Sequence, residues 1–156
     1  MIERLGIGDT VSILGPTTDP PAVLAAADAG ILSSKNETGP LVVLEYMASA
    51  LPWIASDTGE IVRAVRDADV GFVVPPRDHL ALADALERLV TMPGDERRAM
   101  GERGRDLVRT TFDQPLVTRK IEQVYELVLG MRRRAQIDLP SPGDPDGLIA
   151  PRPAIR

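Results

Sequence analysis

Short apolar segments alternate with longer helical segments along most of this chain. The apolar segments are Val11–Leu14, Gly30–Ser33, Trp53–Ser56 and Gly71–Val74. Strands that alternate with helices predict a parallel sheet with helices on both faces. In such sheets, ligands bind beyond the carboxyl ends of the strands. The sequence therefore predicts an α/β, Rossmann-like domain of about four strands, with its site in the loops that follow them.

The segments between the strands carry helix-start signals. Asp19 precedes Pro20 and Pro21, and Asp78 precedes a segment in which apolar residues recur at helical spacing, so both aspartates are expected to cap helices. Beyond Ala135 the sequence has five prolines and little to bury, which predicts a disordered or loosely attached tail over 135–156 after a domain at 1–134. The predicted helices are 20–27, 40–48, 59–66, 79–90, 100–110 and 115–134, with the frayed end of another at 1–9.

Composition excludes several classes of function. The chain has 156 residues, a net charge of −5, no cysteine and one histidine, His79. The acidic balance, without a basic stripe interleaved with aromatics, argues against nucleic-acid binding. The lack of cysteine excludes disulfides and thiolate metal sites, and one histidine argues against a Ser-His-Asp or multi-His site. No apolar run approaches about 18 residues and no signal peptide is evident, so we expect a cytoplasmic protein without a transmembrane segment.

The stretch Ser33–Leu51 is the strongest candidate for a site. Between Leu41 and Ala48 nearly every residue is apolar, which predicts a helix buried on most sides. Pro40 suits the first position of that helix. Glu45 is the one charged residue within it, and a carboxylate in an apolar setting needs partners.

A second acid, Glu37, lies eight residues before Glu45 in the loop that leads into the helix. Between them, the backbone N–H groups of Gly39, Leu41 and Val42 lie at a helix N-terminus, which suits a phosphate. Two acids and free amides would fit a ligand with hydroxyls and phosphates, such as a nucleotide-sugar. Spacing alone is equally compatible with a solvated loop acid and a structural carboxylate held by backbone groups.

Several characteristic sequence segments flank the two acids. Glu37 and Glu45 form an E-x7-E motif within SSKNETGPLVVLEYMASALPWIASDTGEIV, preceded by VSILG and VLAAADAGIL and followed by GFVVPPRDHLALADALERLV. From Val11 to Val128, the chain resembles the C-terminal half of family-4 retaining glycosyltransferases of the GT-B fold.

The resemblance implies sugar transfer from a nucleotide-sugar to an acceptor hydroxyl, with retention of the anomeric configuration. It implies that Glu37 faces the donor sugar as a catalytic residue and that Glu45 binds the ribose hydroxyls. The amides at the helix start would face the distal phosphate. No metal or other cofactor is expected. The donor-binding residues expected on this basis are Ser34, Glu37, Thr38, Gly39, Pro40, Leu41, Val42, Glu45, Thr58 and Gly59.

The resembled enzymes have two Rossmann-like domains, and this sequence matches only part of the second. The sequence has no match to the acceptor-binding domain or to two strands that usually bring an Arg and a Lys to the donor diphosphate. Lys35 and Arg63 are candidates to replace this basic pair, although their spacing in the sequence does not support either one. In the strand order 3-2-1-4-5-6, Val11–Leu14 would lie two empty places from Gly30–Ser33. Unpaired strand edges invite association. We therefore expect an N-terminal half on another chain, self-association or a marginal fold.

At three further positions the sequence differs from the pattern of the resembled family, which limits the roles that the resemblance implies. Only Thr58 and Gly59 separate Asp57 from Glu60, whereas the family usually has a longer, glycine-rich loop there. Trp53 replaces a small β-branched residue and could cover an opened sheet or sit in the core. His79 does not match the family's histidine and is expected to be exposed.

Two interpretations of function stay open. The chain is either a working part of a glycosyltransferase or a non-catalytic nucleotide-sugar-binding or scaffold remnant of one. The triple arginine Arg132–Arg134 would allow peripheral contact with an anionic membrane, or would simply place cations at a helix C-terminus.

Overall fold

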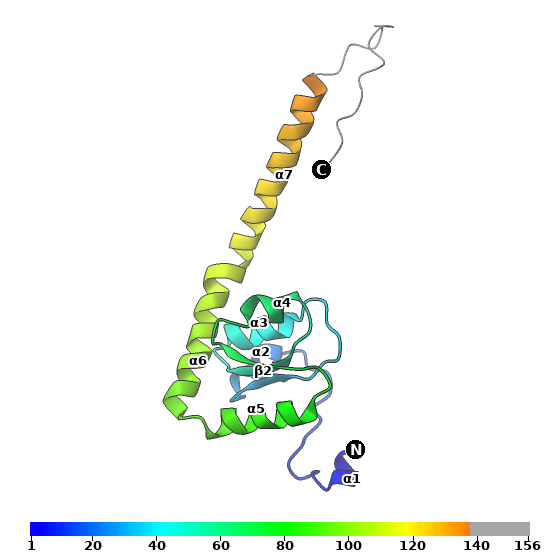
Figure 1. Cartoon of the computed structure of the whole chain (residues 1–156), viewed down its shortest axis with the longest axis vertical. Helices are drawn as coiled ribbons and strands as arrows, with labels where there is room; N and C mark the ends of the chain where they lie inside the picture. The colour runs from blue at the N-terminus through cyan, green and yellow to red at the C-terminus, as the bar shows by residue number, and fades with distance from the viewer. Residues whose placement is uncertain (138–156) are drawn as a thin grey trace. The chain divides into compact units, whose positions relative to one another are not determined.

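The computed structural model describes residues 1–137, with side chains described as far as residue 130 (Figure 1). It divides the chain into two units, Met1–Asp113 and Gln114–Arg156. The first unit holds the sheet and the residues of the candidate site. In the second unit, α7 (Gln114–Ile137) is the part that is described.

A parallel sheet of three strands lies at the centre of the first unit. The strands are β1 (Gly30–Leu32), β2 (Trp53–Ser56) and β3 (Gly71–Val74), in the order β1-β2-β3. Gly30 pairs with Trp53, and Trp53 pairs with Gly71. These strands and the helices between them confirm the predicted α/β fold.

The prediction of a further strand at Val11–Leu14 is wrong. These residues have no regular secondary structure, and their side chains are exposed. A strand is stable only when a neighbour pairs with its backbone groups. In the order that the resemblance implies, two strands would have to lie between this segment and β1, and neither is in the sequence.

Two helices begin at the aspartates that the sequence predicts as their caps. Asp19 Oδ1 accepts a hydrogen bond from Ala22 N at 3.2 Å, and Asp78 Oδ1 accepts one from Ala81 N at 2.9 Å. The helix predicted at 100–110 begins earlier, at Gly94. Asp95 and Glu96 lie in its first turn, where acidic side chains stabilise a helix N-terminus. The helices of the first unit are α1 (Ile2–Leu5), α2 (Pro20–Ala25), α3 (Leu41–Ala48), α4 (Glu60–Val65), α5 (His79–Thr91), α6 (Gly94–Leu107) and the π-helix η1 (Val108–Phe112).

Residues of β2 alternate between two cores, one on each face of the sheet. α3 and α4 cover one face and α5 covers the other (Figure 1). Trp53 is fully buried in the first core, so it is a core residue. Ile54 belongs to the second core. The first core also contains Val43, Met47, Ala55, Val62, Val65 and Val70, and the second contains Val74, Ala85, Leu89 and Met100.

Glycines allow α6 to approach α3 closely. A Cβ on Gly101 would lie 1.9 Å from the carbonyl oxygen of Ala50, and one on Gly104 would lie 3.3 Å from Met47 Cγ. A side chain at Gly101 would therefore collide with backbone. This packing fixes the C-terminal end of α3, the helix that carries Glu45.

The second unit is described by α7 alone. Its apolar residues Val117, Ile121, Val124 and Val128 are exposed. None of the described helices combines the length and apolarity needed to cross a membrane. The side chains of Arg132–Arg134 lie outside the described part of the structure. Of the predicted tail at 135–156, residues 135–137 form the end of α7, so the helix is longer than predicted, and residues 138–156 lie outside the described residues.

Candidate functional site

Two loops meet at the carboxyl ends of β1 and β2. A Cβ on Gly59 would lie 2.6 Å from Pro40 Cδ and 3.3 Å from the carbonyl oxygen of Glu37. Gly59 also has a φ of +78°, which favours glycine. The backbone N–H of Glu60 donates to the carbonyl of Thr38 at 3.0 Å. The structure thus brings together the two predicted parts of the site, residues 37–40 and residues 58–59.

The side chain of Glu45 is exposed on α3, so the prediction of a helix buried on most sides was wrong. Val43 and Met47 are fully buried, but Leu41 is 65% exposed, and Glu45 and Ala48 are exposed with it. These three positions follow the i, i+4, i+7 spacing of one helix face. The apolar run therefore has one face that points away from the core, and Glu45 is on it.

Among the described residues, no hydrogen bond or ion pair to the Glu45 carboxylate is found. The alternative of a structural carboxylate held by the backbone is therefore wrong for this residue. Glu37 is also exposed, in the loop that precedes α3. Both acids are thus free to bind a ligand.

The helix start differs in one detail from the prediction. Pro40 is the N-cap residue of α3 rather than its first residue, with φ −71° and ψ 90°, and it is buried. Its carbonyl accepts the N–H of Val43 at 3.1 Å. The N–H groups of Leu41 and Val42 precede the first intrahelical donors, so helix geometry leaves them for other partners.

The remaining predicted residues have different surroundings. Thr58 is only 7% exposed, and its hydroxyl donates to the carbonyl of Ser56 at 3.4 Å. Thr38 and Gly39 are exposed, and Ser34 is half-buried. The exposed surface of the candidate site is therefore formed by residues 37–39, Leu41 and Glu45, while Pro40, Thr58 and Gly59 are buried.

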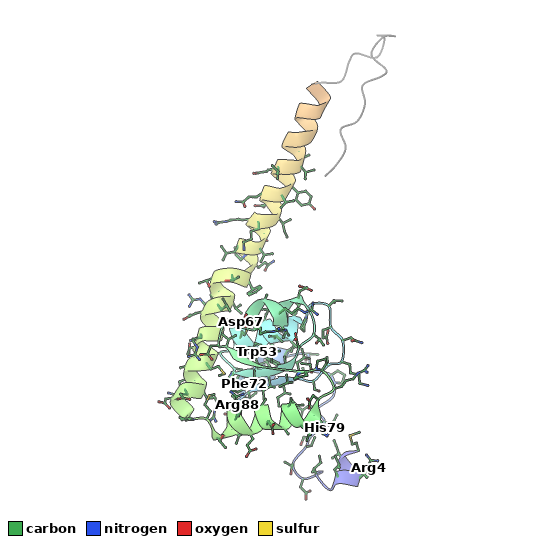
Figure 2. All side chains as sticks on the ribbon, in the orientation of Figure 1. Arg4, Trp53, Asp67, Phe72, His79 and Arg88 are labelled. Atoms are coloured by element: carbon green, nitrogen blue, oxygen red, sulfur yellow. The ribbon has the colours of Figure 1, made fainter. Side chains whose placement is uncertain are left out.

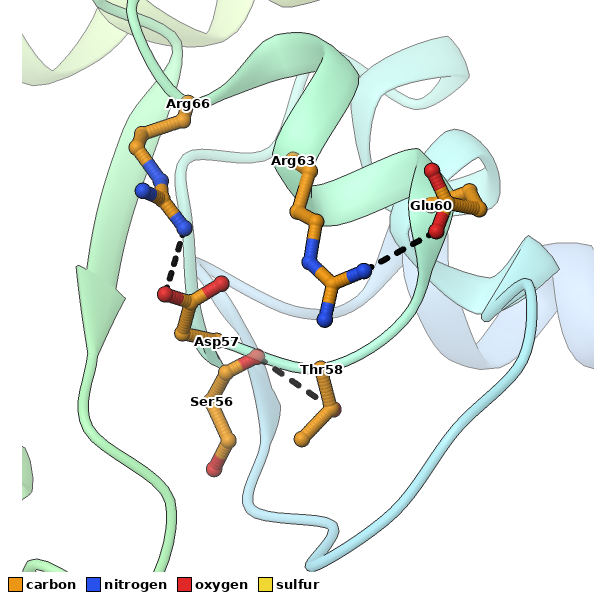
Figure 3. Close-up of polar contacts among 6 residues, drawn as sticks. All are labelled: Ser56, Asp57, Thr58, Glu60, Arg63 and Arg66. Carbon is orange, nitrogen blue, oxygen red and sulfur yellow. Dashed lines mark hydrogen bonds and ion pairs between the residues drawn. The ribbon is translucent and has the colours of Figure 1, made fainter.

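Two ion pairs surround the loop after β2 (Figure 3). Arg66 pairs with Asp57 Oδ2, whereas Asp57 Oδ1 is buried without a partner in the described part of the chain. Arg63 pairs with Glu60 at 2.9 Å on the surface of α4. Because Arg63 already has a partner, it is a weaker candidate for a diphosphate ligand than the exposed Lys35.

Tyr46, which sequence reasoning missed, links the site helix to β1. Its hydroxyl donates to the carbonyl of Ile31 at 3.3 Å. Burial raises the pKa of the Tyr46 phenol, and the neighbouring Glu45 charge raises this pKa further. The sequence feature that could have pointed to this contact is Gly30, because a glycine in a strand leaves room for the tyrosine ring to pack.

The described residues contain no cluster of three or more acidic or histidine side chains that could hold a metal ion. His79 is exposed in the first turn of α5, as predicted.

Comparison with known families agrees with this geometry. The family model described as glycosyl transferases group 1 matches residues 1–107. The chain belongs to this family. It is 38% identical over 127 residues to the D-inositol 3-phosphate glycosyltransferase of Salinispora tropica, covering 80% of this chain and 26% of that protein.

Solved structures of GT-B glycosyltransferases share the fold. Sucrose-phosphate synthase from Thermosynechococcus elongatus superposes with a TM-score of 0.75 and 29% identity, covering 83% of this chain and 33% of that one. Anabaena HepE, determined in complex with UDP-glucose, superposes with a TM-score of 0.74 and 23% identity, covering 80% of this chain and 34% of that one. The chain spans only 14% to 36% of the length of the first four curated relatives.

Proposed function

We propose that this chain is the donor-binding, C-terminal part of a family-4 retaining glycosyltransferase of the GT-B fold. The proposed reaction transfers a sugar from a nucleotide-sugar to an acceptor hydroxyl. Membership of the glycosyl transferases group 1 family supports the reaction class. The main structural support is the Glu45 carboxylate, which is exposed on the same face of α3 as Leu41 and has no protein partner in the described chain.

In this proposal Glu45 binds the ribose hydroxyls of the donor, and Glu37 orients the donor sugar. The free N–H groups of Leu41 and Val42, with the positive end of the α3 dipole, bind the distal phosphate. Catalysis rests on positioning and on stabilising the charge of the departing nucleoside diphosphate. The roles need no metal, and none is proposed.

We infer that the active enzyme contains further strands beside β1. Within β1, Gly30 N–H donates to the carbonyl of Pro52, on the β2 side. Because hydrogen-bonding directions alternate along a strand, Ile31 directs its N–H and C=O away from β2. Among the described residues, no strand pairs with that edge, and the Tyr46 hydroxyl donates to the carbonyl of Ile31 there. Another polypeptide, another part of the gene product or a second copy would supply the missing strands.

Ligand-observed NMR with a panel of nucleotide-sugars tests donor binding. Hydrogen bonds to a charged group contribute roughly 1.5–3 kcal/mol, so Glu45→Gln is expected to weaken binding about ten- to one-hundred-fold. Glu87→Gln, an equal charge change at an exposed position of α5, is the matched control and should bind as the wild type does. Equal affinities for the wild type and Glu45→Gln would overturn the role of Glu45.

A non-catalytic nucleotide-sugar-binding remnant is the second candidate, because only Thr58 and Gly59 separate Asp57 from Glu60, where the resembled enzymes have a longer, glycine-rich loop. The gene sequence upstream of Met1 separates the two. A reading frame that encodes the missing strands and the basic pair supports the enzyme. A stop codon there, with donor binding but no transfer, supports the remnant.

The open β1 edge also predicts self-association of the isolated chain. Light scattering is expected to show a dimer or larger species, or a broad melting transition if the chain stays monomeric. A monomer with a sharp, cooperative transition would show that the edge needs no further strand.

A further inference from the structure

A cavity lies at the carboxyl ends of the strands, on the face that α5 covers. Its volume is about 170 Å³, and its lining includes Ser33, Ser56, Arg77, Asp78 and His79. Figure 2 labels His79 at the start of α5. A water molecule occupies about 30 Å³ of liquid, so the cavity has room for a group of several heavy atoms.

The register of the sheet explains why two serines line this cavity. Leu32 of β1 pairs with Ala55 of β2. Ser33 and Ser56 are the next residues of these two adjacent segments, so they lie side by side. Side chains alternate between the faces of a sheet. Ile54 belongs to the core beneath α5, and Ser56, two residues later, therefore faces the same side.

Ser56 is a buried polar residue without a partner for its hydroxyl. The residue is 4% exposed. Its backbone carbonyl accepts a hydrogen bond from Thr58, but no hydrogen bond of the Ser56 hydroxyl is found among the described residues. Figure 3 shows the side chain directed away from the Asp57–Arg66 pair. The Ser56 oxygen is not among the fully buried side-chain atoms that lack a partner, so it opens onto the cavity and is free to bind a ligand there.

Arg77 brings a positive charge to the same cavity. Arg77 adopts a left-handed backbone conformation with φ +65° and makes no ion pair with another described residue. Such a conformation is uncommon for a residue other than glycine. The cavity also lies at the N-terminus of α5, a helix of 13 residues whose dipole favours an anion there. The single acid, Asp78, directs Oδ1 to the N–H of Ala81.

We propose that this cavity binds a small oxyanion, a phosphate or carboxylate group, through the hydroxyls of Ser33 and Ser56 and the guanidinium of Arg77. The N-terminal end of α5 adds the positive end of its helix dipole. The site is separate from the E-x7-E loop, and the proposal does not depend on the role given to Glu45.

The test is titration of the isotope-labelled chain with inorganic phosphate at constant ionic strength, followed by amide shifts of Ser56 and His79. Acetate titrated in parallel distinguishes a carboxylate site from a phosphate site, and glucose serves as the neutral probe. Ser56→Ala and Arg77→Asn are each expected to weaken binding about ten- to one-hundred-fold. Asparagine tolerates the left-handed conformation, so Arg77→Asn keeps the local backbone.

Matched controls make the result decisive. Ser49→Ala and Arg98→Asn repeat the same changes at exposed positions outside the cavity and should bind as the wild type does. Saturable shifts with phosphate or acetate that both cavity variants lose support the proposal. Shifts that do not saturate, that occur only with glucose, or that persist in Ser56→Ala and Arg77→Asn overturn it. The thermal melt of Ser56→Ala should match that of the wild type, because its hydroxyl has no partner to lose.

Discussion

The aromatic ring of Tyr46 lies directly against the backbone of Gly30. A Cβ on Gly30 would come within 2.4 Å of Tyr46 Cγ, and the tyrosine hydroxyl donates to the carbonyl of the next residue, Ile31. The ring of Tyr46, the residue that follows Glu45, is therefore one contact through which α3 packs against β1. This contact holds α3 at the amino end of β1, next to the exposed Glu45.

Gly30→Ala should destabilise the chain, because the new methyl group would overlap the Tyr46 ring. Overpacking of this kind costs about 1–3 kcal/mol. The free energy of unfolding in urea measures the effect. Gly94→Ala is the control: nothing lies within 4 Å of a Cβ there, and the residue is in a helix, so the change should be neutral or slightly stabilising. Equal stability of Gly30→Ala and the wild type would show that the ring is free to move.

Tyr46 should also make stability depend on pH in the alkaline range. The folded state raises the pKa of its phenol above the ordinary 10.0, so the unfolded chain loses this proton first as pH rises. The stability that Tyr46 contributes is complete below pH 10.0 and is lost as pH rises through the raised pKa. As pH rises above 10, the free energy of unfolding should fall more steeply for the wild type than for Tyr46→Phe. Parallel curves would contradict this.

Gly59→Ala should damage both stability and the proposed donor site. Its φ is positive and the new methyl group would lie 2.6 Å from Pro40 Cδ, so we expect a loss of about 1–3 kcal/mol. The displaced loop 37–40 should also weaken nucleotide-sugar binding. As a stability control, Gly39→Ala meets only Ile61 Cδ1 at 3.9 Å and should change the free energy of unfolding little. Unaltered unfolding and binding in Gly59→Ala would refute the argument.

Local signals were enough to predict most of the fold. The aspartates Asp19 and Asp78 marked helix starts, and the strands that became β1, β2 and β3 were predicted from short apolar segments. The segment Val11–Leu14 carries a similar signal but forms no strand. Strand formation depends on a partner, and the sequence of one segment does not reveal whether a partner exists.

The candidate site was predicted only in part, for a similar reason. The motif identified Glu37 and Glu45, but the apolar run around Glu45 predicted burial, whereas one face of α3 is exposed. Burial depends on which elements pack against a helix, and composition does not contain that information. The close packing of Gly59 and the unpartnered hydroxyl of Ser56 likewise arise from tertiary contacts.

The two ion pairs beside the site should contribute unequally to stability. Side chains of Arg66 and Asp57 are 44% and 34% exposed, whereas those of Arg63 and Glu60 are 57% and 83% exposed. Exposed pairs contribute about 0.2–1 kcal/mol and are screened by salt. Double-mutant cycles to alanine should therefore give the larger coupling energy, near 1 kcal/mol, for Asp57 and Arg66. Arg66→Ala should also cost more than Asp57→Ala, because it leaves a partly buried carboxylate with no cation. Equal couplings that both vanish in high salt would show that both pairs behave as surface contacts.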